Sequence, residues 1–171
     1  MNHHTARPAT KVDPTTFRRS MKHVPTSVAI VTTTVGGRPV GLTVGSFASV
    51  SLDPALVTFF VDHQSTTWPL MANSDTFAIN ILGHGQGECC RSFSSKGADR
   101  FAGVDWTASD DGDPVLAEAS VVLECSKHST RPLGDHLQVV GQVQKLHVLR
   151  EELPLVFHQG SFLNLDHLVS A

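Results

Sequence analysis

The segment GLTVGSFASVSLDP, residues 41–54, decides how this chain is interpreted. Its branched and aromatic residues are typical of a β-strand, but it also carries two glycines, four small hydroxyl side chains and no charged residue before Asp53. The hydroxyls belong to Thr43, Ser46, Ser49 and Ser51. Because VAIVTTTV (28–35) and the turn GGRP (36–39) precede the segment, the pattern predicts a β-hairpin.

Strand patterns also dominate the rest of the chain. The nearly continuous apolar run ALVTFFVD, residues 55–62, predicts a central strand. Further strand-like runs are at 75–82, 120–128, 136–149 and 154–165, and a turn-rich STRPLGD at 129–135 separates two of them. Helices are predicted at about 14–23, with Asp13 as N-cap and Pro14 at the first position, at the start of 66–74, and within 83–96. The sequence therefore predicts a mainly β fold, a six- or seven-stranded antiparallel barrel with a few peripheral helices.

Length and charge restrict the possible functions. The 171 residues suit one domain, predicted at 14–171 after a flexible N-terminal arm at 1–13. A net charge of −3 gives no electrostatic reason to bind nucleic acid or an anionic membrane. Three cysteines without ligand spacing and ten scattered histidines predict neither disulfides nor a metal site. With no signal peptide and no long apolar run, we expect a cytoplasmic protein.

A second hydroxyl cluster, QSTTWP at 64–69, follows the apolar strand and opens a predicted helix. A helix N-terminus can hold a phosphate, and Ser65, Thr66 and Thr67 would complete that site. The alternatives are that these residues only cap the helix and that the hydroxyls of 43–51 only bond nearby backbone. Together the two clusters indicate an uncharged site in which Gly45 allows close approach of a planar, phosphorylated ligand, either a flavin or a nucleotide.

The ordered motifs resemble one known family. GLTVGSFASVSLDPALVTFFVD, STTWPLMANSDTFAINIL, DRFAGVDW, LGDHLQVVGQV and PLVFHQGSF together are similar to the short-chain flavin reductase family, the NAD(P)H-dependent reductase components of two-component flavin monooxygenases. The resemblance implies an FMN-binding split β-barrel, a homodimer, FAD or FMN as the flavin, and reduced flavin that diffuses to a partner monooxygenase. The alternatives from other classes are a non-catalytic flavin- or heme-binding split barrel and a partner-binding module.

The resemblance also assigns roles to individual residues. It places Leu42, Thr43, Val44, Gly45 and Ser46 along the flavin ring and ribityl chain, and Ser49, Val50 and Ser51 farther toward the phosphate. Ser65 and Thr66 would meet the phosphate, and His84, Phe93 and Lys96 are second-rank flavin contacts. His136, in the Gly-Asp-His motif, and Phe157 would receive NADH.

Some features depart from the family pattern or allow two interpretations. Phe157, His158 and Gln159 replace a tyrosine and an arginine or aspartate that are common in the tail. Arg100 either pairs with a carboxylate, which we favour, or meets dinucleotide phosphates. The chain has no GxGxxG motif and no basic cluster for a 2′-phosphate, so NADH is favoured over NADPH. Without a nucleophile or an acid–base pair, catalysis is predicted to depend on positioning alone.

Overall fold

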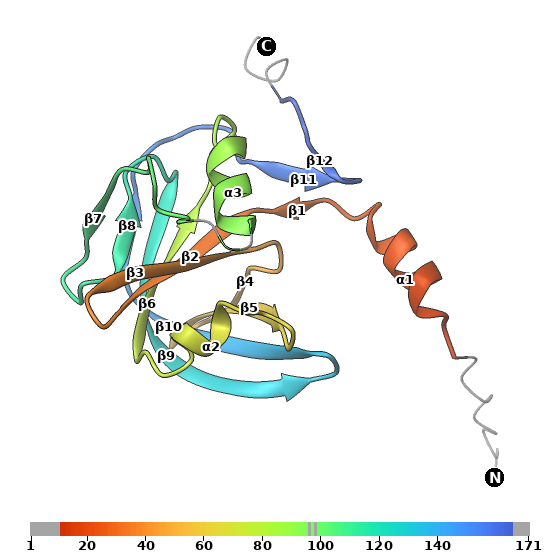
Figure 1. The fold of residues 1–171 in the computed structure, drawn as a ribbon, viewed down its shortest axis with the longest axis horizontal. Helices are drawn as coiled ribbons and strands as arrows, with labels where there is room; N and C mark the ends of the chain where they lie inside the picture. The colour runs from red at the N-terminus through yellow and green to blue at the C-terminus, as the bar shows by residue number, and fades with distance from the viewer. Residues whose placement is uncertain (1–10, 96, 98, 166–171) are drawn as a thin grey trace.

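The computed structural model describes residues 11–95, 97 and 99–165, so most of the predicted arm and Lys96 lie outside the described residues. Its centre is one curled, wholly antiparallel sheet of seven strands in the order β3-β2-β6-β9-β10-β5-β4 (Figure 1). The strands are β2 (Ala29–Val35), β3 (Arg38–Val44), β4 (Ala48–Leu52), β5 (Ala55–Asp62), β6 (Thr76–Ile81), β9 (Val121–Leu133) and β10 (His136–Val148). The predicted mainly β, antiparallel split barrel is confirmed.

The segment 41–54 connects the two edges of this sheet. Its first part pairs with β2 in the predicted hairpin, but its second part is β4, at the opposite edge. The predicted hairpin therefore ends at Val44, and the rest of the segment pairs with β5 instead. The Ser46 hydroxyl lies in the link, where it accepts a hydrogen bond from Phe60 N (2.9 Å) and donates one to Phe60 O (3.2 Å). The Ser46 side chain thus fastens the link between β3 and β4 to β5.

Two other expectations about the strands need correction. The apolar run 55–62 is β5, which lies next to an edge of the sheet, and β9 is the central strand. The run is apolar because Val57, Phe59 and Val61 point into the core. The turn-rich 129–135 is mostly strand, since β9 continues to Leu133 and only Gly134 and Asp135 form the turn. Pairing with β10 outweighs the local turn preference of this segment.

Alternate residues of the strands supply two hydrophobic clusters, one on each face of the sheet. The inner cluster contains Phe59, whose ring lies edge-on to Trp68 and Phe77 at centroid distances of 6.2 and 5.6 Å. The outer cluster packs Phe93 and Leu155 against residues such as Ile30. Most of the core is therefore built by the sheet itself, with helices only at its margins.

The helices are short. α1 (Pro14–Met21) begins as predicted, with Asp13 Oδ2 accepting from Thr16 N at 2.8 Å, and ends two residues before the predicted boundary. It has no buried residue and projects away from the barrel (Figure 1). α2 (Trp68–Met71) has only four residues, and α3 (Gly87–Ser94) occupies the middle of the predicted 83–96. Within the described part of the chain, no helix is long and apolar enough to cross a membrane.

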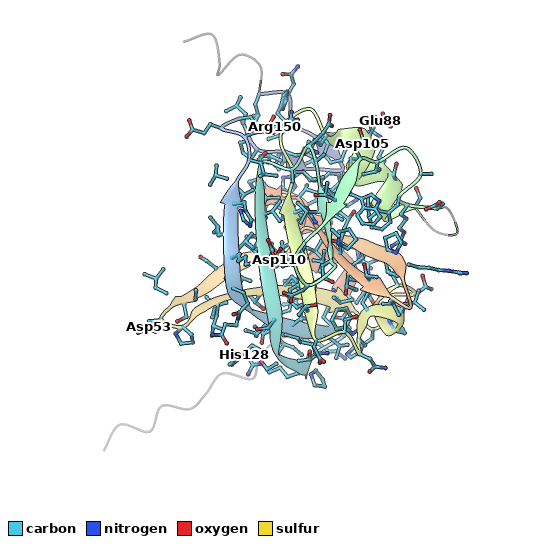
Figure 2. The ribbon with its side chains drawn as sticks, turned by 90° about the vertical axis from the view of Figure 1, so that its left-hand side faces the viewer. Asp53, Glu88, Asp105, Asp110, His128 and Arg150 are labelled. Carbon is cyan, nitrogen blue, oxygen red and sulfur yellow. The ribbon has the colours of Figure 1, made fainter. Side chains whose placement is uncertain are left out.

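Two small sheets complete the fold. β1 (Thr26–Ser27), β11 (Val156–His158) and β12 (Ser161–Phe162) form one, next to α3 and α1. β7 (Trp106–Ala108) and β8 (Pro114–Leu116) form a hairpin that the sequence did not predict. Its loop crosses the face of the main sheet, where Figure 2 shows Asp110 in front of the strands. Asp110 makes an ion pair there with Lys145 of β10.

Candidate functional site

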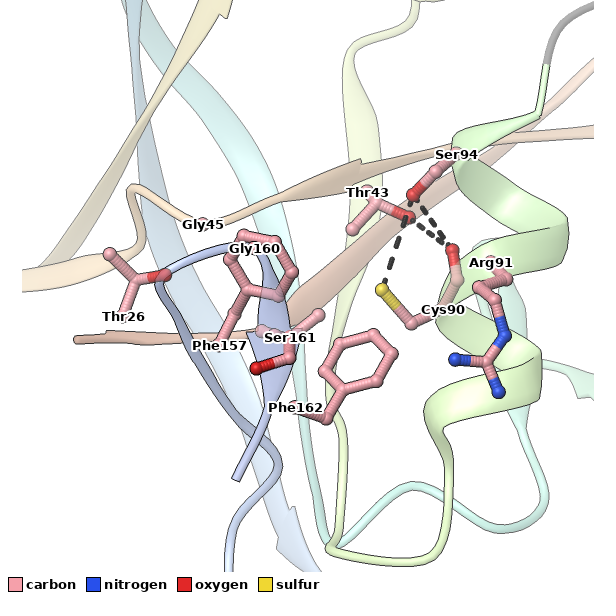
Figure 3. A pocket seen from close by; sticks show the side chains of 11 residues that line it. Thr26, Thr43, Gly45, Cys90, Arg91, Ser94, Phe157, Gly160, Ser161 and Phe162 are labelled. Atoms are coloured by element: carbon pink, nitrogen blue, oxygen red, sulfur yellow. Dashed lines mark hydrogen bonds between the residues drawn. The ribbon is translucent and has the colours of Figure 1, made fainter. Parts of the chain in front are cut away.

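A hollow of about 510 Å³ lies between β3, α3 and the β11–β12 tail, next to the segment 41–54 (Figure 3). We call it the aromatic hollow. Thr43 and Gly45 of β3 and its extension, Cys90 and Ser94 of α3, and the rings of Phe157 and Phe162 are among its lining residues. The two rings lie 5.6 Å apart, centroid to centroid, at 65°. The space is mostly apolar and is wide enough for a planar ring system.

A second hollow of about 290 Å³ adjoins the first, and we call it the hydroxyl hollow. It is lined by Leu42, Thr43 and Val44 of β3, by the end of β5 and the segment 64–67, and by Phe93, Ser94 and Arg100. Thr43 and Ser94 line both hollows, so the two spaces are neighbours across one pair of side chains. A mostly apolar space therefore lies next to a more polar one, as an amphipathic ligand requires.

Hydrogen bonds hold the wall between the two hollows in place. Thr43 Oγ1 and Ser94 Oγ both donate to Cys90 O, at 3.3 and 2.8 Å (Figure 3). These bonds tie the end of β3 to the last turns of α3. The Thr43 and Ser94 side chains are thus fixed by hydrogen bonds to the α3 backbone and do not rotate freely.

The segment 64–67 lies just before a helix, as the sequence predicted, but this helix, α2, is short. Ser65 Oγ accepts from Trp68 N at 3.1 Å, so the capping alternative describes Ser65. With four residues, α2 is too short to contribute an appreciable dipole to phosphate binding. Thr66 and Thr67 still line the hydroxyl hollow. Any phosphate there would depend on these hydroxyls and on the Arg100 guanidinium.

The structure brings together only part of the predicted flavin site. Seven of the predicted residues line one or both hollows: Leu42, Thr43, Val44, Gly45, Ser65, Thr66 and Phe93. Ser46 is beside them but bonds to Phe60. Ser49, Val50 and Ser51 lie on β4 and line neither hollow, with the register shift falling between Ser49 and Ser51.

The second-rank flavin contacts lie in three different places. His84 lines another hollow, with Glu151 and Glu152. Phe93 is buried, and its ring lies edge-on to Phe101 at 4.8 Å. Lys96 is outside the described residues. Of the three, only Phe93 thus belongs to the hydroxyl hollow.

The Gly-Asp-His turn lies beside the hydroxyl hollow. His136 opens β10 opposite Asp62, which lines this hollow, and His63 N donates to Asp135 O at 3.1 Å. The His136 ring nitrogen Nδ1 is 2.6 Å from Asp135 Oδ1, and this hydrogen bond lowers the pKa of the Asp135 carboxyl. Phe157 lies in the aromatic hollow instead. The two predicted NADH residues are therefore near different hollows of the same site.

Sequence reasoning named Phe93 of α3 but missed Cys90 and Arg91 of the same helix. Cys90, Arg91 and Ser94 all line the aromatic hollow. The Arg91 guanidinium lies 5.4 Å from the centroid of the Phe162 ring and pairs with Glu88. Spacings of three and four residues place Arg91 and Cys90 on the same side of the helix as Ser94, and this periodicity was the available signal.

Arg100 differs from the expectation of a carboxylate pair. Its Nη1 donates to Gly41 O at 2.7 Å and its Nε to Ser95 O at 3.1 Å. Among the described residues it forms no ion pair. Partial burial lowers the pKa of this guanidinium, although arginine stays charged at neutral pH. A guanidinium that pairs with no described carboxylate therefore borders the hydroxyl hollow, which Asp62 also lines.

The cysteines of α3 are not activated nucleophiles. Burial raises the pKa of the Cys89 thiol to about 11 and also raises the pKa of the Cys90 thiol. Both stay protonated at neutral pH, as expected for side chains that pack in a helix. Within the described ranges, no group of three or more His, Cys, Asp or Glu side chains is arranged to hold a metal ion.

These features fit a flavin. The ring system needs a flat, mostly apolar space, which the aromatic hollow provides, and close backbone approach, which Gly45 allows. A Cβ at Gly45 would lie 3.1 Å from Thr26 Oγ1, so a larger residue would crowd this wall. The ribityl and phosphate groups need donors, and Thr66, Thr67 and Arg100 border the adjoining hollow. Fold and site together define a split-barrel protein that is suited to a planar, phosphorylated ligand.

Comparison with known proteins identifies the family. Residues 21–166 match the family model described as a flavin reductase like domain, and the chain belongs to this family. It is 38% identical over 158 residues to the reductase subunit HsaB of a flavin-dependent monooxygenase from Rhodococcus jostii, which covers 92% of this chain and 81% of the relative. It is also 38% identical over 152 residues to a flavin reductase from Pseudomonas putida, covering 88% and 89% of the two chains.

A solved structure agrees with this assignment. The NADH:FAD oxidoreductase SgcE6 from Streptomyces globisporus, in complex with NAD and FAD fragments, matches with a TM-score of 0.84 at 34% identity. The match covers 92% of this chain and 97% of that one. The family predicted from the sequence motifs is thereby confirmed.

Proposed function

We propose that this protein is an NAD(P)H-dependent flavin reductase that transfers hydride from NADH to FAD or FMN. The observation that carries the proposal is the pair of adjoining hollows, one apolar and one polar, that share Thr43 and Ser94 in a member of the flavin reductase family. The flavin supplies the hydride-accepting chemistry and NADH supplies the hydride. The residues of the chain bind and orient the two molecules.

Positioning is the main task of the protein in this reaction. The Cys90 carbonyl accepts hydrogen bonds from Thr43 and Ser94, so the two hydroxyl oxygens stand in a set place beside the ring as acceptors. Polar groups that are fixed in this way need no reorganisation during the reaction. The Phe157 and Phe162 rings form an apolar wall of the aromatic hollow. Raised thiol pKa values in α3 leave the site without a competing thiolate.

NADH is proposed to bind with contacts from His136 and Phe157. His136 is half-exposed at the rim of the site, and its ring nitrogen Nδ1 is hydrogen-bonded to the Asp135 carboxylate. Phe157 is partly exposed at the aromatic hollow and can pack against a nicotinamide ring. Arg91 is engaged by Glu88 and the Phe162 ring, which leaves it poorly placed to recognise a 2′-phosphate. This arrangement favours NADH over NADPH.

The proposed partner is a flavin-dependent monooxygenase that receives diffusible reduced flavin. We also propose a homodimer, because six large apolar side chains on β4, β9, β10 and the segment after β10 are exposed. They are Val50, Leu52, Leu133, Leu146, Val148 and Leu149. A second copy would cover them. Light scattering after size exclusion tests the dimer, and a monomer at micromolar concentration would contradict it.

The catalytic proposal is tested by mixing the purified protein with each flavin and each nicotinamide and following NADH absorbance. Oxidation of NADH that depends on added flavin, and that is faster than with NADPH, is the expected result. Flavin binding without oxidation would indicate the alternative, a non-catalytic flavin- or heme-binding barrel. Neither binding nor oxidation would indicate a partner-binding module.

A further inference from the structure

The C-terminal hairpin β11–β12 has strands of only three and two residues, and β12 is an edge strand of its small sheet. A hairpin this short is not stable by itself in water, so contacts outside it must fix its position. At its base, the buried Leu155 donates from N to Leu82 O at 2.9 Å. At its turn, Gln159 N donates to Lys22 O at 3.1 Å. The edge strand is held differently, because its Phe162 ring contacts α3.

This contact gives α3 a part in the reaction. We propose that Gly87 and Arg91 are positioning residues, which hold the Phe162 ring and, through it, the Phe157 ring that receives the nicotinamide of NADH. Together with Glu88 they are called here the α3 socket. The inference rests on the proposed function, since it concerns how the nicotinamide is received at the same site.

Gly87 lets the Phe162 ring lie directly against the start of α3. A Cβ at this position would be 3.0 Å from Phe162 Cδ2 and 3.2 Å from Phe162 Cε2, which is closer than ordinary van der Waals contact. Gly87 is the first residue of α3, and its φ is not in the left-handed region, so the backbone does not require a glycine there. The close approach of the ring is therefore what a larger residue would disturb.

The Arg91 guanidinium contacts the same ring. Its Cζ lies 5.4 Å from the Phe162 centroid, within the range of a cation–π interaction (Figure 3). Glu88 Oε1 accepts a hydrogen bond from Arg91 Nη2, and this bond lowers the pKa of the Glu88 carboxyl, so both groups are charged at neutral pH. Because the ion pair is exposed, it adds little to the stability of the fold. Its effect is to orient the guanidinium toward the ring.

The position of Phe162 sets the position of Phe157. The two residues are direct partners in the register of β11 and β12, and their ring centroids lie 5.6 Å apart at 65°. Cross-strand aromatic pairs of this kind restrict each other. Phe157 is 40% exposed and lines the aromatic hollow, so part of its ring is open to a ligand. Since hydride transfer depends on sub-ångström alignment of the two reacting rings, a shift in the socket changes how the nicotinamide is received.

Substitutions in the socket test the proposal. Gly87→Ala adds a Cβ against the ring, and Arg91→Gln removes the cation beside it. In both variants we expect KM for NADH to rise about fivefold at saturating flavin, with kcat and the flavin Kd within about twofold of the wild type. Amide hydrogen exchange in residues 156–163 should become about threefold faster, because the hairpin is held less firmly. Arg91→Lys keeps a cation beside the ring and should stay within about twofold of the wild type in every value.

Gly85→Ala is the matched control for Gly87→Ala. A Cβ at Gly85 would meet nothing within 4 Å, and its φ is not in the left-handed region, so the kinetic constants and the exchange rates should not change.

Three results would overturn the inference: an unchanged KM for NADH in both socket variants, a flavin Kd that weakens as much as KM, or faster exchange with an unchanged KM. Each of them, together with flavin-dependent NADH oxidation by the wild type, would leave the proposed function intact. Absence of oxidation by the wild type with both flavins would remove the proposed function, and the inference with it.

Discussion

The threonines of β2 and the Ser and Thr residues around the end of β3 are of the same chemical type but have different hydrogen-bond partners. Thr32 Oγ1 donates to Pro114 O at 2.5 Å, Thr33 Oγ1 to Asp113 Oδ1 at 2.9 Å, and Thr34 Oγ1 to Gly112 O at 2.7 Å. All three partners lie on the β7–β8 hairpin, which covers the face of the sheet. Every hydroxyl in this region therefore holds two parts of the fold together.

Around the hollows the hydroxyls are divided between two uses. Ser46 and Ser65 bond to backbone and complete the fold. Thr43 makes one long bond at 3.3 Å, and neither Thr66 nor Thr67 makes a side-chain hydrogen bond to another described residue, although both line hollows. A hydroxyl thus indicates a site only where no strand or loop covers it. The comparison teaches that the covering element, not the residue type, decides the role.

The largest expected effect concerns the covered region, where Asn80 is fully buried. Its Nδ2 donates to Ile30 O at 3.2 Å and Thr32 Oγ1 at 3.0 Å, and its Oδ1 accepts from Leu116 N at 2.8 Å. Asn80→Ala would leave the Leu116 amide unpaired and create a cavity, so we expect a loss of about 2–4 kcal/mol in the free energy of unfolding. Urea unfolding measures it. A loss below about 1 kcal/mol would show that the network contributes little.

A matched pair of substitutions breaks the comparison directly. Thr32→Val removes a buried hydroxyl that is bonded twice, and should cost about 1–2 kcal/mol while leaving flavin affinity unchanged. Thr43→Val removes a hydroxyl beside both hollows, and should cost less than about 1 kcal/mol while weakening flavin binding several-fold. Thermal unfolding and flavin titration of both variants give the four values. The reverse pattern would place the functional hydroxyl in β2.

A smaller effect is expected at the rim of the site. His136→Ala removes a half-exposed side chain, so stability should change little, while KM for NADH should rise about fivefold and flavin Kd should stay within about twofold. His128→Ala, a change of the same kind on an exposed part of β9, is the control. Unchanged NADH kinetics in the His136 variant would remove the role assigned to this residue.

Local patterns predicted those parts of the fold that local forces determine. The apolar and β-branched runs of β2 and β6, the Asp13 cap of α1 and the family motifs all act over a few residues, and the structure places them as expected. The crossing at Gly45–Phe47 was not predictable, because it depends on where the far edge of the sheet lies. The four-residue length of α2 and the carbonyl partners of Arg100 likewise depend on tertiary packing. Motifs therefore located the site, but only packing shows which hydroxyls face it.

The smallest expected effect is the pH dependence of the covered region, through Asp113. This residue is 4% exposed, and burial raises the pKa of its carboxyl although Thr33 donates to it. A carboxyl whose folded-state pKa is raised contributes fully to stability below its unfolded pKa and loses that contribution as pH rises through the folded value. Asp113→Asn cannot titrate and keeps an acceptor for Thr33. The stability of the variant relative to the wild type should therefore increase as pH rises from the acid range to neutrality, measured by thermal unfolding at each pH. If the difference in stability between variant and wild type is constant with pH, ionisation of Asp113 does not destabilise the folded protein. The hydrogen bond from Thr33 then compensates fully for the burial of the charge.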